Sequence, residues 1–357
     1  MTIIKPSEAF PSANWSSGDV RAFHKDQTPL AVDTVQDVRD NDFESTRWLY
    51  VKAKGVFYRL NPSSTASDDG DAVLRDSQGR RYEKQGGGGA VSSVNGQTGA
   101  VVLNIREKLT ADRTYYVRTD GSDSNDGQSN SSGGAFLTLA RAEQALRLLD
   151  LAGYTATVQI VDGTYTAGVT ITGPYVGGNV IWKGNSATPA NVLVNTTSDC
   201  FIVQDGAVTT VKDMELRSSS GYALRAQRGA AVVKYGNLRF GACGTGHLLV
   251  TDIASAVCES NYTISGSTNY HMYLGALSVL RVQSTTVTLS GTPNFASDFV
   301  RAEQGAVALI TANTFSGSAT GRRYNAAQNG IVMSGGAGAT YLPGNTSGTT
   351  STGGQYI

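Results

Sequence analysis

The sequence predicts a mainly β protein whose larger part is a right-handed parallel β-helix, a solenoid of short strands. Short apolar runs followed by small-residue turns recur in the second half of the chain at a period near 25 residues. These repeats are rich in Val, Thr, Tyr, Gly and Ser, which favours strands over helices. Charged residues cluster before a glycine run, which predicts a separate small module ahead of the solenoid.

The N-terminal module is predicted for residues 1–85, which carry 12 Lys/Arg and 13 Asp/Glu of the 29 and 29 in the chain. Gly86 to Gly89 would form a flexible joint. The run WLYVKAKGVFYRL predicts two short strands around Gly55, and SQGRRYEK predicts a turn into another strand. The segment before Trp48 is predicted as an extended arm. The module is therefore expected to be small, charged and β-rich.

A short collar is predicted within residues 86–104. In AVSSVNGQTGAVVLN, apolar residues flank Asn95-Gly96, which is the strongest two-residue hairpin signal. The pattern V-x-S-V-N-G-x-T-G-x-V-x-L resembles a collar segment that recurs in tail fibres and tail spikes of bacteriophages. The alternative is an ordinary hairpin linker.

The solenoid is predicted for residues 105–357. One repeat column contains Leu216, Phe240, Ile264, Leu289 and Phe315, and a second contains Gly206, Gly229, Gly305 and Gly330. Leucine-rich repeats would need a Leu/Asn ladder, and a propeller blade would need roughly 40–45 residues. A coil of about three short strands fits instead, with like residues stacked at roughly 4.8 Å.

A loop and a helix precede the solenoid. The loop DGSDSNDG, Asp120 to Gly127, fails the calcium-binding EF-hand pattern in either register, so we interpret it as structural, with calcium as the alternative. A helix over 138–150 would place Leu139, Ala142, Leu146 and Leu149 on one face, with Thr138 as N-cap. Such a helix would cap the open end of the coil.

The first coils carry a further resemblance. The runs VDGTYTAGVTI, GPYVGGNV and GNSATPANV resemble the opening coils of phage tail-spike β-helices. With the collar, this resemblance covers roughly residues 90–357. It implies a homotrimeric virion tail appendage, made in the host cytoplasm, whose N-terminal module docks to other tail or baseplate proteins.

Composition argues against several classes of function. The 29 Lys+Arg balance the 29 Asp+Glu, so no net charge attracts nucleic acid. No apolar stretch is long enough to span a membrane, and MTIIKPSEAF is not a signal peptide. Neither the cysteines nor the histidines have metal-ligand spacing, so no metal or cofactor is predicted. The residues concerned are Cys200, Cys243, Cys258, His24, His247 and His271.

Catalysis would need a pair of carboxylates, because many β-helical tail spikes cleave polysaccharides and glycoside hydrolysis uses two acids. The acids on the coil are Asp205, Asp213, Glu215, Asp252, Glu259, Asp298 and Glu303. Asp252 and Glu303 align two coils and one position apart, and Asp213 with Glu215 and Arg217 is the nearest approach to a lyase site. Nothing marks either pair as catalytic, so no catalytic residue is assigned.

Binding is better supported than catalysis. Tyrosine offers a flat apolar face with a polar tip, which suits sugar rings. The candidates are Tyr222, Arg225, Arg228, Tyr235, Tyr262, Tyr270, Tyr273 and Arg301. The alternative is that these tyrosines pack between subunits. The sequence thus favours a virion appendage that binds a host cell-surface glycan; the alternatives are a polysaccharide depolymerase and a purely structural spike.

Overall fold

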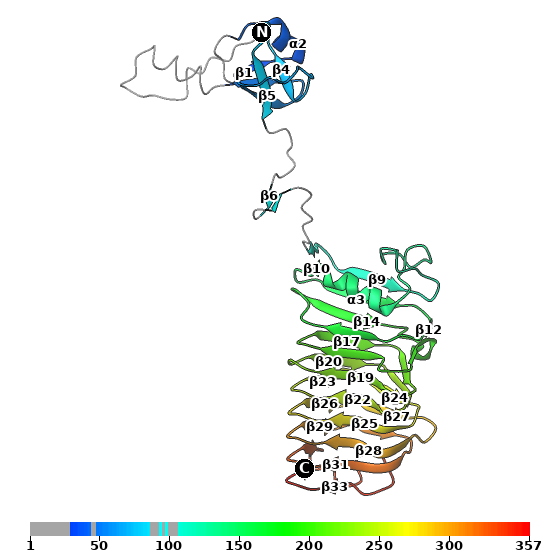
Figure 1. The fold of residues 1–357 in the computed structure, drawn as a ribbon. Coiled ribbons are helices and arrows are strands. Elements are labelled where there is room, and N and C mark those ends of the chain that lie inside the picture. Colours follow the sequence, from blue (N-terminus) through cyan, green and yellow to red (C-terminus); the bar gives the residue numbers. More distant parts are fainter. Residues whose placement is uncertain (1–28, 44–47, 86–92, 95–96, 99–105) are drawn as a thin grey trace. The chain divides into compact units, whose positions relative to one another are not determined.

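A computed structural model describes residues 29–43, 48–85, 93–94, 97–98 and 106–357. The chain divides into two compact units, Met1–Leu103 and Asn104–Ile357. Each unit has a hydrophobic core of its own. Figure 1 shows the larger unit as a stack of short strands, coil upon coil.

The N-terminal unit contains a five-stranded sheet in the order β1-β2-β3-β5-β4 and a short helix. The elements are β1 (Leu30–Val32), α2 (Val35–Asp40), β2 (Trp48–Val51), β3 (Val56–Leu60), β4 (Val73–Arg75) and β5 (Arg81–Gln85). The two strands predicted around Gly55 are confirmed. The predicted extended arm is wrong for residues 29–43, because Thr34 and Asp37 form a capping box that starts α2 and Val38 is fully buried.

The predicted collar hairpin is present as two paired short strands. β6 (Ser93–Val94) and β7 (Gln97–Thr98) run antiparallel, with Ser93 opposite Thr98. The Asn95-Gly96 turn itself and the Gly86–Gly89 joint lie outside the described residues.

Three parallel sheets run along the larger unit, and one strand of each makes one coil. The ten-stranded sheet contains β9 (Arg113–Val117), β11 (Thr155–Ile160), β14 (Asn179–Lys183), β17 (Val208–Lys212), β20 (Val232–Gly236), β23 (Ser255–Cys258), β26 (Val279–Gln283), β29 (Val307–Thr311), β32 (Ile331–Met333) and β34 (Gln355–Tyr356). The seven-stranded sheet contains β12 (Gly163–Tyr165), β15 (Val192–Thr196), β18 (Glu215–Ser218), β21 (Arg239–Cys243), β24 (Tyr262–Ile264), β27 (Thr286–Leu289) and β30 (Thr314–Ser316). The eight-stranded sheet contains β13 (Val169–Thr172), β16 (Phe201–Gln204), β19 (Tyr222–Gln227), β22 (Gly246–Val250), β25 (Thr268–Leu274), β28 (Asn294–Ala302), β31 (Thr320–Ala326) and β33 (Thr349–Thr350). The predicted parallel β-helix with three strands per turn is confirmed.

Helix α3 (Leu139–Arg147) lies at the N-terminal end of the coil, where it packs against β9 and β13. The Thr138 hydroxyl accepts a hydrogen bond from the Arg141 N–H at 3.1 Å, so the predicted N-cap is confirmed. The apolar face of the helix joins the core of the coil, which confirms its capping role. The helix ends before residue 150 because Leu149 enters a short strand, β10 (Leu149–Asp150), which pairs with β8 (Glu107–Lys108).

Strand pairing tests the predicted repeat column residue by residue. Leu216 pairs with Phe240, Phe240 with Ile264, and Ile264 with Leu289, as predicted. The placement of Phe315 is wrong, because it pairs with Val287. Gly317 takes the place below Leu289, where a Cβ would lie 2.2 Å from the Leu289 carbonyl oxygen. An irregularity in the register of β28 accompanies this longer coil.

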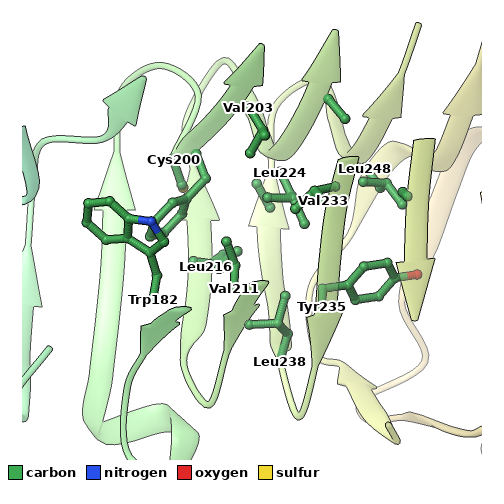
Figure 2. Packing of buried hydrophobic residues seen from close by; sticks show 14 of the residues in the cluster. Trp182, Cys200, Val203, Val211, Leu216, Leu224, Val233, Tyr235, Leu238 and Leu248 are labelled. Carbon is green, nitrogen blue, oxygen red and sulfur yellow. The ribbon is translucent and has the colours of Figure 1, made fainter. Parts of the chain in front are cut away.

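The coil interior is filled by stacked apolar side chains. Figure 2 shows Trp182, Leu216, Leu224 and Tyr235 among this packing, and each of the four is almost fully buried. Because equivalent positions of successive coils lie about 4.8 Å apart, each side chain contacts its equivalents above and below. One inward-facing column therefore depends on all of its members.

Six turns between the eight-stranded and ten-stranded sheets have two successive residues at positive φ, and the turn after β19 has three, Arg228, Gly229 and Ala230. In the six turns the second of these residues is Gly206 (φ 78), Ile253 (φ 65), Leu277 (φ 59), Gly305 (φ 72), Asn329 (φ 60) or Gly353 (φ 77). Only glycine adopts this left-handed conformation without steric cost. The predicted glycine column is therefore a column of left-handed turns, although Gly330 lies one residue past its turn.

We expect Leu289→Asp to abolish soluble assembly, because the side chain is only 6% exposed and lies in the inward column. Losing its burial costs roughly 1.5–3 kcal/mol, and an unpaired buried charge costs more. Gln283→Asp is the control, since Gln283 is exposed at the end of β26. The measurement is the soluble yield and solution mass of each variant. Equal tolerance of the two changes would contradict the inward placement.

Candidate functional site

The aspartate-rich loop between β9 and α3 has a structural role. Asp123 accepts a hydrogen bond from the Thr138 N–H at 2.9 Å, which fixes the start of the helix. Asp120 pairs with Arg118 at 2.7 Å, and Asp126 accepts from a backbone N–H two residues on. Its carboxylates are therefore all engaged within the loop and its flanks, as the sequence predicted.

Other kinds of site were sought throughout the part of the chain that the structure describes. In that part no group of three or more His, Cys, Asp and Glu side chains could hold a metal ion. Within the same residues, no helix has the length and apolar character needed to cross a membrane. All three cysteines are free and buried, and burial raises the pKa of Cys200 to about 11, of Cys243 to about 12 and of Cys258 to about 11. Thiols with such pKa values are poor nucleophiles at neutral pH.

Asp213, in the turn before β18, and Glu215, the first residue of β18, are the candidate lyase acids, and both are buried. Asp213 accepts a hydrogen bond from the Asn237 side chain of the next coil at 2.7 Å. Glu215 lies between two guanidinium groups, with Arg217 at 2.6 Å and Arg239 at 3.1 Å. These partners link neighbouring coils. The contacts of both acids therefore explain their burial without a catalytic role.

Asp252 and Glu303 lie two coils and one residue apart, as the strand register requires. That spacing corresponds to about 10 Å along the coil axis, at the far limit of the separation that inverting glycosidases use. Asp252 is exposed in a turn, whereas Glu303 accepts a hydrogen bond from the Tyr273 hydroxyl. The two carboxylates therefore do not share one pocket-like environment.

Two of the predicted glycan-binding tyrosines, Tyr235 and Tyr262, point into the coil. Tyr235 is 1% exposed and Tyr262 is 3% exposed, and Figure 2 shows Tyr235 within the core. Their rings pack edge to face around Phe240. The prediction that these two tyrosines bind a ligand on the outer surface is wrong, because inward and outward positions alternate along β20 and β24.

Three other predicted tyrosines come together on the outer face of the eight-stranded sheet. The rings of Tyr270 and Tyr273 are 5.2 Å apart between centroids. The Arg301 guanidinium lies 5.3 Å from the first centroid and 5.9 Å from the second. Arg225 lies 5.5 Å from the ring of Tyr222. Both residues are on β19, which is two strands from β25 in the same sheet. We call these five residues the tyrosine–arginine cluster.

A departure from strict inward–outward alternation brings Tyr270 and Tyr273 to the same face. In β25 two successive side chains, His271 and Met272, are both buried in the coil. Tyr270 and Tyr273 flank them, so both emerge on the outer face although they are three residues apart. The neighbouring strands of the sheet have the same pair of successive buried residues, Ala223–Leu224, His247–Leu248 and Phe299–Val300. The register of β25 against β28 shifts just before Tyr270, where β28 has one extra residue.

Gly246 of β22 leaves room for the Tyr222 ring. Tyr222 and Tyr270 pair with Gly246 from opposite sides. A Cβ at Gly246 would lie 2.4 Å from a carbon of the Tyr222 ring, so any larger residue would displace it. The ring of Tyr222 therefore lies over Gly246, on the side of β22 that leads to β25, and is only 7% exposed.

Charges beneath the cluster balance one another. Asp298 is fully buried and binds the Arg301 and Arg322 guanidinium groups, the former at 3.2 Å. Arg225 pairs with Asp199 at 2.7 Å. With Glu303 included, three arginines face three carboxylates. The face therefore offers aromatic and hydrogen-bonding groups but has little net charge.

Sequence reasoning missed Asp199, Gly246 and Arg322, since their places beside the cluster depend on how the coils stack. The Tyr273 hydroxyl keeps its proton, because burial and its hydrogen bond to Glu303 raise its pKa. Arg228 lies outside the cluster, where it pairs with Asp205 at 3.2 Å in an exposed turn. The predicted candidates thus separate into five that meet, two in the core and one at a turn.

A buried hydrogen-bond chain lies inside the coil behind the cluster. His247 Nε2 is 2.8 Å from the Gly241 carbonyl oxygen, so this nitrogen donates. His247 Nδ1 then accepts from His271 Nδ1 at 3.0 Å, and His271 Nε2 accepts from the Tyr262 hydroxyl at 2.9 Å. This assignment satisfies both rings as neutral imidazoles. Burial lowers the pKa of His247 to about 3 and that of His271 well below its usual value.

Comparisons with known proteins yield few similar proteins. No protein-family model matches the chain, and no curated protein matches it either. Among solved structures, the chain is similar to the tailspike protein gp49 of the Acinetobacter baumannii bacteriophage Fri1, a capsular polysaccharide depolymerase. The identity is 11%, with 92% of this chain and 69% of that chain covered, at a TM-score of 0.23.

We expect the coil to lose stability as the pH falls from 7.5 to 5.5. Unfolded histidines take up protons below a pKa of about 6.5, whereas His247 and His271 stay neutral in the folded coil. The unfolded state then binds more protons than the folded state. Each histidine therefore lowers the free energy of unfolding by up to about 1.4 kcal/mol per pH unit below pH 6.5. The measurement is the free energy of urea unfolding at both pH values.

The matched control for this titration is His271→Gln, because an amide can donate to His247 and accept from Tyr262. This variant should lose about half of the pH dependence of the wild type. The buried Glu143, whose pKa burial raises, titrates in both proteins and cancels in the comparison. Identical pH dependence in the two proteins would contradict the neutral histidine pair.

Proposed function

We propose that this protein is a phage tail appendage that binds a host cell-surface glycan through the outer face of its eight-stranded sheet. The observation that carries the proposal is the tyrosine–arginine cluster. Tyr270, Tyr273 and Arg301 lie within 6 Å of one another, and Arg225 lies 5.5 Å from the ring of Tyr222 on the same parallel-strand surface. Tyrosine rings can stack on the apolar faces of sugars, and arginine side chains donate hydrogen bonds to their hydroxyl groups.

A polysaccharide depolymerase is the second candidate. Arg301 Nε is 3.2 Å from a carboxylate oxygen of Asp298 and 3.9 Å from one of Glu303. The two carboxylates are therefore at most about 7 Å apart, which is compatible with a glycosidase pair. Binding remains the better proposal, because Asp298 is fully buried between two arginines and so cannot reach a glycosidic oxygen.

The remaining parts of the chain have proposed roles in the same particle. The N-terminal unit would attach the protein to other virion proteins, and three coils would lie side by side in a homotrimer. Three copies of a weak glycan site can raise avidity 10²–10⁴-fold without any new contact. This arrangement suits a charge-balanced cluster, whose single-site affinity would be modest.

A fragment of residues 90–357 is expected to stain host cells and to block adsorption of the phage particle. A fragment of residues 1–85 should do neither, because it lacks the coil. The measurement is fluorescence of labelled fragments on host cells, together with plaque counts in competition. If the coil fragment stains no host cell, the glycan-binding proposal fails.

Tyr273→Ala should weaken binding of purified host glycan at least about tenfold, which corresponds to 1.4 kcal/mol of lost stacking. Tyr154→Ala is the matched control, since Tyr154 is 37% exposed and lies near the capping helix, away from the cluster. Glycan affinity is measured by titration calorimetry. Equal affinity of the two variants would place the site elsewhere.

Cleavage is tested on the same purified protein and host polysaccharide. Release of reducing ends or unsaturated products, abolished by Asp252→Asn or Glu303→Gln, would establish the depolymerase. Binding without product release is the expected outcome. If the protein neither stains host cells nor cleaves the polysaccharide, the proposal of a purely structural spike is favoured.

Light scattering of the full chain should give about three times the protomer mass of 37.4 kDa. A mass near one protomer at micromolar concentration would contradict the homotrimer.

A further inference from the structure

An aliphatic ridge runs along the outside of the coil where the ten-stranded sheet begins. It consists of the first, outward-facing residues of five strands, with Ser255 of β23 between Val232 and Val279 in the same column, and of two turn residues beside them. These are Val208, Val232, Val279, Val307 and Ile331 in the strands, and Ile253 and Leu277 in the turns. Val208 is 48% exposed, Val279 is 41%, Ile253 is 63% and Leu277 is 64%.

The turn residues of the ridge adopt an unfavourable backbone conformation. Ile253 (φ 65) and Leu277 (φ 59) occupy the left-handed position that other coils fill with glycine (Gly206, Gly305, Gly353) or with Asn329. A Cβ disfavours this conformation, most strongly for a β-branched residue such as isoleucine. Both side chains also remain largely in water, so the coil alone gains little from them. A partner that covers them would explain why these residues stand there.

The other two faces of the same coils differ from the ridge. The outward column of the seven-stranded sheet includes Thr263, Thr288 and Ser316. The eight-stranded sheet carries the tyrosine–arginine cluster with its ion pairs. Exposed aliphatic side chains in line along the coil axis usually mark an interaction surface.

We propose that copies of this chain associate through the aliphatic ridge, with their coils parallel and the ridges facing a common axis. This proposal rests on the proposed homotrimer and assigns it a face. The partner must present aliphatic groups at the same spacing of about 4.8 Å per coil, and a second copy does so. Ridges related by rotation about an axis along the coil meet at equal heights.

The size of the ridge suits the centre of such an interface. Six strands at the usual spacing, with the turn beside them, cover roughly 25 Å by 15 Å, on the order of 400 Å² per copy. Each partner contributes about 800 Å² to a standard interface, in which a polar rim surrounds an apolar centre. Neighbouring polar residues on both sides of the ridge would supply that rim.

Charges on the two edges of the ridge are complementary. On the sheet side, Arg281 lies two residues after Val279 and Lys212 lies four after Val208, and neither has an ion-pair partner among the described residues. On the turn edge, Asp252 is exposed and bonds only a neighbouring threonine hydroxyl at 3.3 Å. In a cyclic assembly the turn edge of one copy faces the sheet side of the next. Opposite charges would then meet at the rim.

The test compares the solution mass of full-length variants by light scattering across a range of concentrations. The double variant Ile253→Gly with Leu277→Gly relieves the left-handed backbone and removes both exposed side chains. It should fold, as judged by circular dichroism, yet dissociate to single protomers at concentrations at least about 100-fold higher than the wild type. Val279→Lys should also dissociate the assembly, whereas Thr288→Lys, at an exposed position of another sheet, should not.

Each outcome separates the ridge from the glycan proposal. If both ridge variants have the solution mass of the wild type, the proposal that the ridge is the interface is wrong, even if staining of host cells is intact. Unfolding of the double glycine variant would also overturn it, because the two side chains would then act within one chain. A monomeric wild type would remove both ridge and trimer but not glycan binding. A trimer that depends on the ridge but binds no glycan would support the ridge alone.

Discussion

The fold depends on parallel strands that stack in register, one coil upon the next. Each residue then lies about 4.8 Å from its equivalents, so one position in the repeat becomes a column along the whole coil. Inward columns must be apolar, as from Leu216 to Leu289, or must satisfy every polar atom internally. The His247–His271 chain meets the second condition, because each nitrogen has a partner only while both rings are neutral.

Functional character arises where the regular pattern of inward and outward residues is interrupted. In β25 two successive buried residues, His271 and Met272, place Tyr270 and Tyr273 on one side, which strict alternation would not allow. In the turns, a left-handed position usually held by glycine instead carries Ile253 or Leu277. Both features are unfavourable or irregular for an isolated strand. Departures of this kind are expected at sites that serve binding more than folding.

The sequence was sufficient for the coil, its capping helix and most of one inward column. It failed at Phe315, because the longer coil before β30 shifts the pairing by two residues without changing the apolar pattern. It also failed for Tyr235 and Tyr262, since a tyrosine in a strand reads alike whether it points in or out. The site around Tyr222 depends on Gly246, which leaves room for the ring. Which side chains lie beside a glycine in a strand is known only once the stacking of the coils is known.

The proposed binding face and the proposed association face share an edge of the coil. Strands of the eight-stranded sheet lead directly into the turns that carry Ile253 and Leu277, and Glu303 stands where β28 enters its turn. The hydrogen bond from Tyr273 to Glu303 therefore links the tyrosine–arginine cluster to the border of the ridge. If ridges meet at a common axis, each cluster lies beside the groove between two coils. A glycan bound there would contact a surface whose outer border is set by the neighbouring copy, so assembly would define the site as well as multiply it.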